Sequence, residues 1–242
     1  KMIFILLPAF NEEKNLKVIF KKIEKNFESK KKIRVILIDD YSVDNTKKLI
    51  SKKYKFKIIY KKHKKNEGLN IAMETGLKLI NKKAKLNDIV VSLDSDNTHP
   101  ISLIPKMIKK INKGNDIVIA SRFVKGSKVS GLASWRQIMS VGAKVIFKLF
   151  YPFKNLSDYT CNFRAYKFQH IKKVLNNKNF FKDEDFNIAA KILLFLITNN
   201  RNLKLAEVPL TLRYDLKIGN SKMKIFKTIF LTLRLIFIRK FN

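Results

Sequence analysis

Acidic residues gather in three short segments of the chain, and one of these segments has the spacing of a cation site. Residues 8–13, 39–44 and 94–99 together hold seven of the 19 acidic residues. In the third segment, Asp94 and Asp96 are separated by one residue, so both carboxylates can approach one divalent cation. Mg²⁺ and Mn²⁺ take oxygen ligands and usually complete their coordination with substrate phosphates. The pair therefore indicates a metal-bound diphosphate, with a helix cap or a turn as the structural alternative.

The hydrophobic pattern predicts how the fold positions these segments. Short apolar runs predict buried strands at residues 3–7, 35–38, 56–60, 89–93 and 117–120. Amphipathic periodicity predicts helices between them, at residues 16–27, 45–53, 68–81 and 105–111. This alternation indicates an α/β fold, a mostly parallel sheet flanked by helices on both faces. Because ligands of such sheets bind beyond the carboxyl ends of the strands, we expect the three acidic segments to form one site.

After residue 122 the pattern is less regular. It predicts a loop at 126–133, a helix at 135–151, a strand at 161–166, a helix at 184–198 and an extended segment at 203–213. The sequence contains no internal repeat and no flexible linker. We therefore expect one domain over residues 1–220, followed by a separate helix at 221–242.

The net charge of +33 does not by itself define a function. Lysine supplies most of it beside abundant Asn, Ile and Phe, which is what a bias toward AT-rich codons produces. Such a charge attracts polyanions, so a non-enzymatic polyanion-binding protein is one alternative. The sequence has no helix-turn-helix, zinc-finger or aromatic RNA-binding signature, and acidic strand ends repel phosphates unless a metal intervenes. We therefore predict no nucleic-acid partner.

The sequence also predicts where the protein acts. A single cysteine, Cys161, fits a reducing compartment, and no apolar run reaches the roughly 18 residues that cross a bilayer. Residues 221–242 predict a basic amphipathic helix whose apolar face would lie in an anionic membrane interface, pack on the domain or pair with another chain. We expect a cytoplasmic protein held peripherally at the inner face of the membrane. The sequence does not define an oligomeric state.

Several motifs, taken in chain order, resemble those of family 2 glycosyltransferases, and above all the dolichol-phosphate mannosyltransferase group. They are Pro8-Ala9-Phe10-Asn11-Glu12-Glu13, Asp39-Asp40-x-Ser42-x-Asp44-x-Thr46, Gly68-x3-Ala72-x3-Gly76, Asp94-x-Asp96-x2-His99-Pro100, Ser121-Arg122-Phe123 and Asn162-Phe163-Arg164-Ala165-Tyr166. The segment Glu207-Val208-Pro209, Arg213 and Gly219-Asn220-Ser221-Lys222 extend the likeness, which covers about residues 2–222.

The resemblance implies a Rossmann-like GT-A fold and inverting, metal-dependent transfer of a hexose from a GDP- or UDP-sugar to polyprenyl phosphate. It also implies residues that bind the nucleotide-sugar donor: Pro8, Phe10, Glu12, Ile38, Asp40, Asp94 and Ser95. Mg²⁺ or Mn²⁺ would be held by Asp94, Asp96 and Thr98, the last at a position where the family often has Gln. The family often has an acid in the helix that here includes residues 186–190.

The chemistry of a lipid-phosphate acceptor indicates further residues. Its oxygen is already anionic, so it needs cations that hold it in line more than it needs a general base. The candidates are Arg122, Arg164, Arg213 and Lys222, because the guanidinium fork of Arg binds phosphate through two parallel hydrogen bonds. With Asp94 and Asp96, Arg122 completes the predicted catalytic set. A related transferase that glycosylates a saccharide hydroxyl is the alternative, and that hydroxyl would need a general base.

Overall fold

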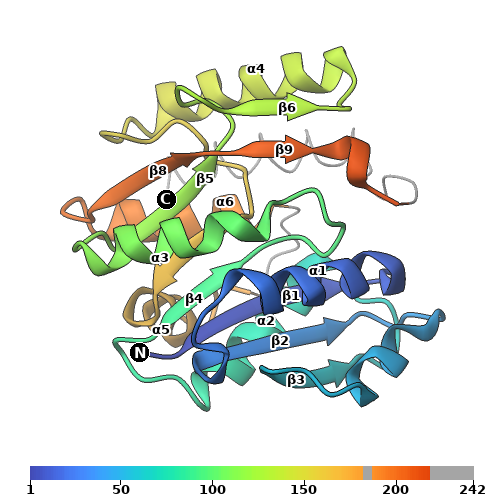
Figure 1. Ribbon diagram of the computed structural model, residues 1–242. Coiled ribbons are helices and arrows are strands. Elements are labelled where there is room, and N and C mark those ends of the chain that lie inside the picture. The colour runs from blue at the N-terminus through green and yellow to red at the C-terminus, as the bar shows by residue number, and fades with distance from the viewer. Residues whose placement is uncertain (182–186, 219–242) are drawn as a thin grey trace.

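The computed structural model describes residues 1–181 and 187–218 (Figure 1). A seven-stranded sheet has the order β3-β2-β1-β4-β7-β5-β8. Its strands are β1 (Ile3–Ala9), β2 (Ile33–Asp39), β3 (Lys57–Lys62), β4 (Ile89–Ser92), β5 (Ile117–Ser121), β7 (Arg164–Lys167) and β8 (Leu205–Pro209). All of them are parallel except β7, which runs antiparallel to its neighbours β4 and β5. The carboxyl ends of the parallel strands therefore share one edge, as the sequence predicts.

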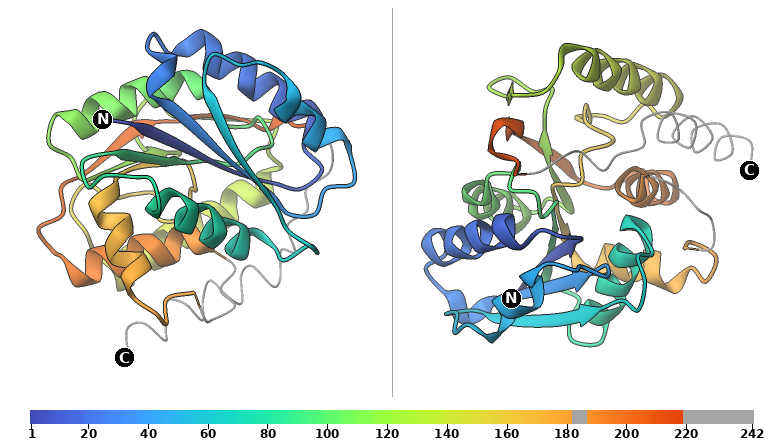
Figure 2. Two further views of the ribbon diagram at one scale, coloured as in Figure 1. Left: turned by 90° about the horizontal axis from the view of Figure 1, so that it is seen from below. Right: turned by 90° about the vertical axis from the view of Figure 1, so that its right-hand side faces the viewer.

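Helices cover both faces of this sheet, because each helix has one apolar face to bury (Figure 2). The helices α1 (Glu13–Asn26) and α3 (Ile104–Asn112) pack on one face, whereas α2 (Leu69–Asn81), α5 (Phe168–Asn176) and α6 (Ile188–Asn199) pack on the other. Gly76 lets α2 approach β1 closely, since an added Cβ would lie 2.2 Å from a methyl group of Leu6. In the motif Gly68-x3-Ala72-x3-Gly76, the last glycine thus makes a close packing contact with β1, whereas Gly68 lies just before α2 with open space around it.

A second, two-stranded sheet lies beside the main one. It pairs β6 (Lys128–Ser130) with β9 (Thr211–Arg213), and α4 (Ser134–Phe150) lies above it in Figure 1. One face of α4 is apolar yet open to solvent, with exposed fractions from 47% to 74% at Trp135, Ile138, Val141, Val145 and Leu149. Among the described residues, no helix is both long and apolar enough to span a bilayer.

Four details differ from the sequence expectations. The predicted loop at 126–133 contains β6, and the predicted strand at 161–166 is shorter and antiparallel. The predicted helix at 45–53 is the 3-10 helix η2 (Asn45–Ser51), and α5 had no predicted counterpart. Short 3-10 turns also form at η1 (Lys30–Lys32), η3 (Ile101–Leu103) and η4 (Tyr214–Leu216). Lys222 and the predicted helix at 221–242 lie outside the described residues.

Candidate functional site

The loops that follow β1 and β2 are joined to each other by hydrogen bonds. The backbone N–H of Asn11 donates to the Ser42 hydroxyl at 2.9 Å, and the Val43 N–H donates to the Asn11 side chain at 2.8 Å. The N–H of Glu13, at the start of α1, donates to the Asp44 carboxylate at 2.9 Å. Asp44 therefore holds the first turn of α1 against the loop after β2, and it also accepts from the Thr46 N–H in η2.

Three residues at this edge have left-handed backbone. They are Asn11, Tyr41 and Asn97, with φ of 55°, 71° and 63°. Each follows shortly after the end of β1, β2 or β4. Non-glycine residues adopt this conformation at a cost and often do so at functional sites. The turn geometry therefore recurs where the three acidic segments meet.

Asp39 and Asp40 are buried and use their carboxylates to hold protein atoms. Asp39 accepts hydrogen bonds from the Ser42 N–H at 2.7 Å and from the Tyr60 hydroxyl at 2.6 Å. Asp40 contacts His63 Nδ1 at 2.8 Å and accepts from the N–H groups of Glu67 at 2.8 Å and Gly68 at 2.7 Å. Both oxygens of Asp40 are thus engaged by the segment that leads into α2.

Asp94 lies just beyond β4 and is held by two neighbours. Asn162 donates to its carboxylate at 3.0 Å, and the Asp94 N–H donates to His99 Nδ1 at 3.3 Å. Ser95 follows, and its hydroxyl oxygen is buried without a hydrogen-bond partner among the described residues. The segment therefore presents a carboxylate beside an unsatisfied hydroxyl.

Asp96 faces two different groups with its two carboxylate oxygens. Oδ1 accepts from the Thr98 hydroxyl at 2.7 Å and from the Thr98 N–H at 3.2 Å. Oδ2 forms an ion pair with the Lys217 ammonium at 2.8 Å. Burial raises the pKa of Asp96, but the charges of His99 and Lys217 and the hydrogen bonds from Lys217 and Thr98 lower it further, so the net shift is downward. The carboxylate is therefore held ionised.

Lys217 follows directly after η4 and brings its ammonium to Asp96. Burial lowers its pKa, and the charge of Asp96 more than offsets this, with smaller contributions from Tyr214 and Glu12. The pKa of Tyr214 is raised by burial and then by the charges of Asp94 and Asp96. These electrostatic interactions place both carboxylates near Tyr214, and Asp96 near Lys217 as well.

The residues at this edge fit a hard divalent cation. Among residues 1–181 and 187–218, no three His, Cys, Asp or Glu side chains gather as a self-sufficient metal site. Two carboxylates with hydroxyl groups nearby are, however, the kind of oxygen set on which Mg²⁺ or Mn²⁺ completes its coordination with phosphates and water. The buried Ser95 hydroxyl has no hydrogen-bond partner among the described residues and Asp96 already binds an ammonium, so both fit a cation at this position.

Arg122 is positioned by a buried ion pair. Its guanidinium donates to both oxygens of Asp158, at 2.8 and 2.7 Å, and its backbone N–H donates to the same carboxylate at 3.0 Å. Burial lowers the pKa of Arg122, but Asp158 raises it more, so the group stays charged. Arg122 also donates to the Thr160 hydroxyl and, at 3.4 Å, to Ser140 in α4. Much of its charge is compensated before any phosphate arrives.

Two of the other predicted acceptor ligands, Arg164 and Arg213, are engaged by other groups of the protein. Arg164 is 0% exposed and donates to the carbonyl oxygens of Ala189 and Tyr159, so the protein interior occupies it instead of an acceptor. Arg213 lies at the surface and forms an ion pair with Asp215 through three hydrogen bonds of 2.6 to 3.0 Å. Its backbone N–H donates to the Thr98 carbonyl at 3.0 Å, so β9 lies against the loop that carries Asp96.

The predicted donor residues of the first two strands lie side by side. Pro8 and Ile38 are register partners in β1 and β2, and both are buried. Phe10 is half-buried, and Glu12 accepts a hydrogen bond from the Asn15 side chain at 2.6 Å. An open hollow of about 590 Å³ adjoins the loop after β2 and is lined by residues 41–45, Lys47, Lys48, Ser51 and Lys62. That Pro8, Phe10, Glu12 and Ile38 bind the donor stays a prediction.

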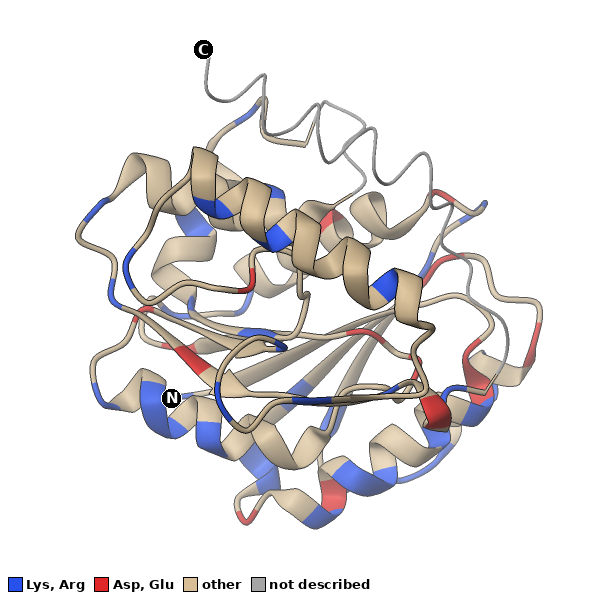
Figure 3. Cartoon of the chain, turned by 90° about the horizontal axis from the view of Figure 1, so that it is seen from above, with Lys and Arg blue, Asp and Glu red and all other residues tan. Residues whose placement is uncertain are grey.

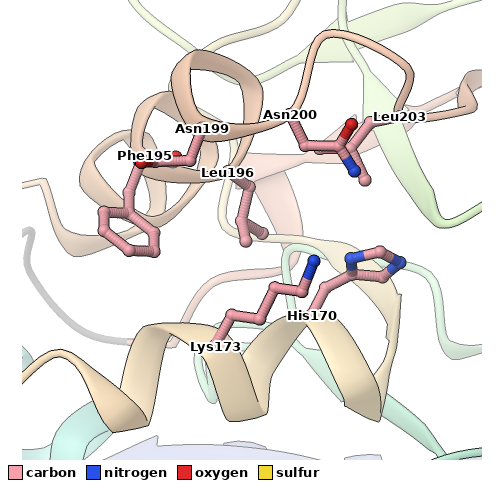
Figure 4. A pocket seen from close by; sticks show the side chains of 7 residues that line it. All are labelled: His170, Lys173, Phe195, Leu196, Asn199, Asn200 and Leu203. Carbon is pink, nitrogen blue, oxygen red and sulfur yellow. The ribbon is translucent and has the colours of Figure 1, made fainter.

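A more enclosed cavity of about 210 Å³ lies elsewhere, between α5 and α6 (Figure 4). The side chains of His170 and Lys173 extend into it from α5, and Phe195 and Leu196 face it from α6. His170 lies 3.2 Å from Asp116, and burial lowers its pKa more than Asp116 raises it. This cavity does not include any of the acidic segments.

Sequence reasoning did not single out Lys217, Asp158 or Asn162. Asn162 belongs to a quoted motif, but nothing in the sequence links its side chain to Asp94. Lys217 is one of many lysines, and Asp158 is 36 residues from its partner Arg122, so neither carries a local signal. Only the fold brings these residues to the site.

The family is settled by a match over most of the chain. Residues 4–175 match glycosyl transferase family 2. The chain belongs to this family. A relative, dolichol-phosphate mannosyltransferase of Pyrococcus furiosus, is 32% identical over 237 residues, which is 96% of this chain and 62% of that protein. The chain thus spans less than two thirds of that relative's length.

One further relative and one solved structure are also similar to the chain. UDP-N-acetylglucosamine–dolichyl-phosphate N-acetylglucosaminyltransferase of Methanococcus voltae is 26% identical over 97% of this chain and 96% of that protein. Glucosyl-3-phosphoglycerate synthase from Mycobacterium tuberculosis, crystallised with Mn²⁺, UDP and glucosyl-3-phosphoglycerate, superimposes with a TM-score of 0.65. That alignment has 14% identity and covers 99% of this chain and 80% of the other. The expected GT-A type of fold is therefore confirmed.

Proposed function

We infer that the protein transfers a hexose, with inversion, from a nucleotide sugar to a polyprenyl phosphate at a membrane surface. The observation that carries this proposal is the pair Asp94 and Asp96 at the edge where the parallel strands end. Asp96 forms an ion pair with the ammonium of Lys217, and both carboxylates act on Tyr214. The names of two relatives, from Pyrococcus furiosus and Methanococcus voltae, specify dolichol phosphate and dolichyl phosphate, which supports the acceptor class. The base and the sugar of the donor remain open between GDP- and UDP-linked hexoses.

The donor diphosphate would lie over Asp94 and Asp96, which would hold Mg²⁺ or Mn²⁺. A bound metal supplies positive charge that stabilises the departing diphosphate. The protein's own part is to keep Asp96 ionised, through Thr98 and Lys217, and to orient Asp94 through Asn162. Mycobacterial glucosyl-3-phosphoglycerate synthase has been crystallised with Mn²⁺ and UDP and also with Mg²⁺ and UDP, which supports either metal.

The acceptor phosphate would approach from the side of α4. Arg122 lies at the end of β5, is 15% exposed at its side chain and reaches Ser140 of α4. Asp158 orients the guanidinium through two bonds, and Nη1 makes a single long bond, of 3.4 Å, to Ser140. Nη1 would therefore be the atom that positions an acceptor phosphate. A lipid phosphate is anionic near neutral pH, so this positioning suffices and no strong base is required.

The exposed apolar face of α4 supports a membrane surface as the place of reaction. Its apolar side chains lie on one side of the helix, while Arg136, Lys144 and Lys148 provide positive charge along its length (Figure 3). An amphipathic helix of this kind binds in the headgroup region through apolar burial and attraction to anionic lipid. The site of Arg122 adjoins this helix, so a lipid acceptor would enter from the membrane.

A transfer assay tests the proposed reaction. Purified protein would be incubated with polyprenyl phosphate and a panel of GDP- and UDP-sugars, with Mg²⁺, Mn²⁺ or EDTA. We expect one donor to give a lipid-linked hexose only when a metal is present. Transfer to a free saccharide hydroxyl with none to the lipid phosphate would contradict the proposal and favour the saccharide transferase.

A liposome assay tests the membrane surface separately. Leu149 is 74% exposed on α4 and Leu86 is 52% exposed on a distant loop, so the two form a matched pair. We expect Leu149→Ser to weaken binding to anionic vesicles by about tenfold, the loss of one buried leucine side chain, and Leu86→Ser to leave binding unchanged. Equal binding by both variants would remove α4 from the proposed interface.

A further inference from the structure

The ammonium of Lys217 occupies the position on Asp96 that a metal would need. It lies 2.8 Å from Oδ2, and the two side chains are only 18% and 14% exposed, so solvent screens the pair weakly. The other carboxylate oxygen, Oδ1, is already engaged by Thr98. A divalent cation that approached Asp96 would therefore meet a positive charge at the one oxygen left to it.

The surroundings of this pair hold charges of both signs. Lys22 reaches in from α1 and donates to the Asn97 side chain at 2.7 Å, and its pKa is lowered by burial and by the charge of Arg213. Two carboxylates also lie nearby. The charge of Asp94 raises the pKa of Tyr214, and the charge of Glu12 raises the pKa of Lys217. A divalent cation alone would have to compete with an ammonium that is fixed to the protein.

The Lys217 side chain can move without a change in the fold. The backbone before it is held at three points: Arg213 N–H on Thr98, Lys217 N–H on Tyr214, and Gly131 against Asp215. Gly131 has φ of +73°, and a Cβ there would lie 2.5 Å from the Asp215 nitrogen, so the two segments are in close contact. The lysine stem, by contrast, has four flexible carbon–carbon bonds that allow the ammonium to swing to a new partner.

We propose that Lys217 competes with the divalent cation for Asp96 in the nucleotide-free protein, and that the diphosphate of the donor releases this competition by taking the ammonium as its own partner. This inference rests on the proposed metal and donor site and adds that the metal and the donor diphosphate bind to it cooperatively. The metal binds weakly alone and tightly together with the diphosphate. Lys217 then becomes a contact of the leaving group, so the same residue excludes a bare metal and holds the completed complex.

Thermodynamic linkage gives the measurable consequence. If a nucleoside diphosphate raises the affinity for Mn²⁺, then Mn²⁺ raises the affinity for the nucleoside diphosphate by the same factor. Coupling between two sites commonly amounts to about 5- to 150-fold. Removing the ammonium should raise the affinity for Mn²⁺ alone and should reduce this coupling factor.

The experiment measures Mn²⁺ binding by the electron paramagnetic resonance of free Mn²⁺, with no nucleotide, with UDP and with GDP. We expect Lys217→Met to bind Mn²⁺ alone about tenfold more tightly than the wild type and to lose at least about tenfold of the coupling. Lys217→Gln provides a second neutral variant, and circular dichroism melting confirms that each is folded. Lys217→Arg retains the charge and should retain the coupling.

Two controls separate the possible outcomes. Lys128→Met removes the same charge from an exposed position on β6 and should bind Mn²⁺ like the wild type. Asp96→Asn should abolish Mn²⁺ binding even with nucleotide. Suppose that Asp96→Asn abolishes Mn²⁺ binding, but both neutral Lys217 variants bind Mn²⁺ alone as weakly as the wild type. The role proposed for Lys217 is then contradicted, while the proposed function stands. If no protein binds Mn²⁺ with either nucleotide, the proposed metal site fails and this inference fails with it.

Discussion

The loops after β2 and β4 contain the same residue types but use them differently. After β2, the carboxylates of Asp39 and Asp40 accept hydrogen bonds from backbone N–H groups and from neutral or histidine side chains. After β4, Asp96 binds a lysine ammonium through Oδ2 and accepts from the Thr98 N–H and hydroxyl through Oδ1, and Asp94 accepts from one amide. The difference lies in the partners. A carboxylate surrounded by N–H groups of its own chain holds a loop in place, whereas one that faces a mobile cation can exchange that cation for another.

The strongest test of this comparison is Asp96→Asn. The neutral amide cannot replace the charge that would hold a divalent cation, so we expect hexose transfer to fall at least about a hundredfold, and circular dichroism confirms that the variant is folded. Initial rates at saturating donor and acceptor measure the effect. Asp215→Asn serves as the control, because Asp215 is an exposed carboxylate on η4 that pairs, among the described residues, with Arg213. Unreduced transfer by Asp96→Asn would end the assignment of this residue.

The loop after β2 should respond in stability. The N–H groups of Glu67 and Gly68 donate to different carboxylate oxygens of Asp40. In Asp40→Asn one of these oxygens becomes an NH₂ group. Whichever way the amide is oriented, that NH₂ group faces one of the two N–H donors, which then lacks an acceptor. We expect the free energy of unfolding to fall by about 2 kcal/mol, measured by urea denaturation. An unchanged stability together with a higher KM for the donor would instead make Asp40 a direct donor ligand, as the family resemblance implies.

Thr98 lies between these two cases, since its hydroxyl holds a carboxylate that is predicted to bind the metal. Thr98→Val keeps the backbone N–H bond to Asp96 Oδ1 and removes the hydroxyl bond of 2.7 Å. A residue that only orients a ligand typically changes metal affinity by about tenfold, which we expect for Mn²⁺ measured with UDP or GDP present. Thr98→Ser should bind Mn²⁺ normally. Complete loss in Thr98→Val would make the hydroxyl a metal ligand itself, as the sequence predicts.

Local pattern predicted the parallel strands of the main sheet and the position of Asp94 and Asp96, because both depend on neighbours in sequence. An apolar run such as 89–93 indicates a buried strand wherever it lies, and the chain turns where the run ends. The direction of β7 could not be predicted, since it depends on pairing with β4 and β5, which are distant in sequence. For the same reason, the pattern gave no sign that Arg164 is buried against α6 or that Lys217 reaches Asp96.

The smallest expected effect comes from the support that Asp39 gives to the loop after β2. Tyr60→Phe removes the hydroxyl that donates to Asp39 and should lower the free energy of unfolding by about 1 kcal/mol at pH 7. Burial and then the bond to Asp39 raise the pKa of Tyr60, so the folded protein retains a proton that the unfolded chain loses above about pH 10. Stability from this bond is therefore complete below that pH and declines above it. Urea unfolding of both proteins between pH 7 and 11 should show the wild type's advantage narrowing above pH 10. A constant difference would mean that the hydroxyl does not bind a charged carboxylate, and Asp39 would then lose its place in the contrast between the two loops.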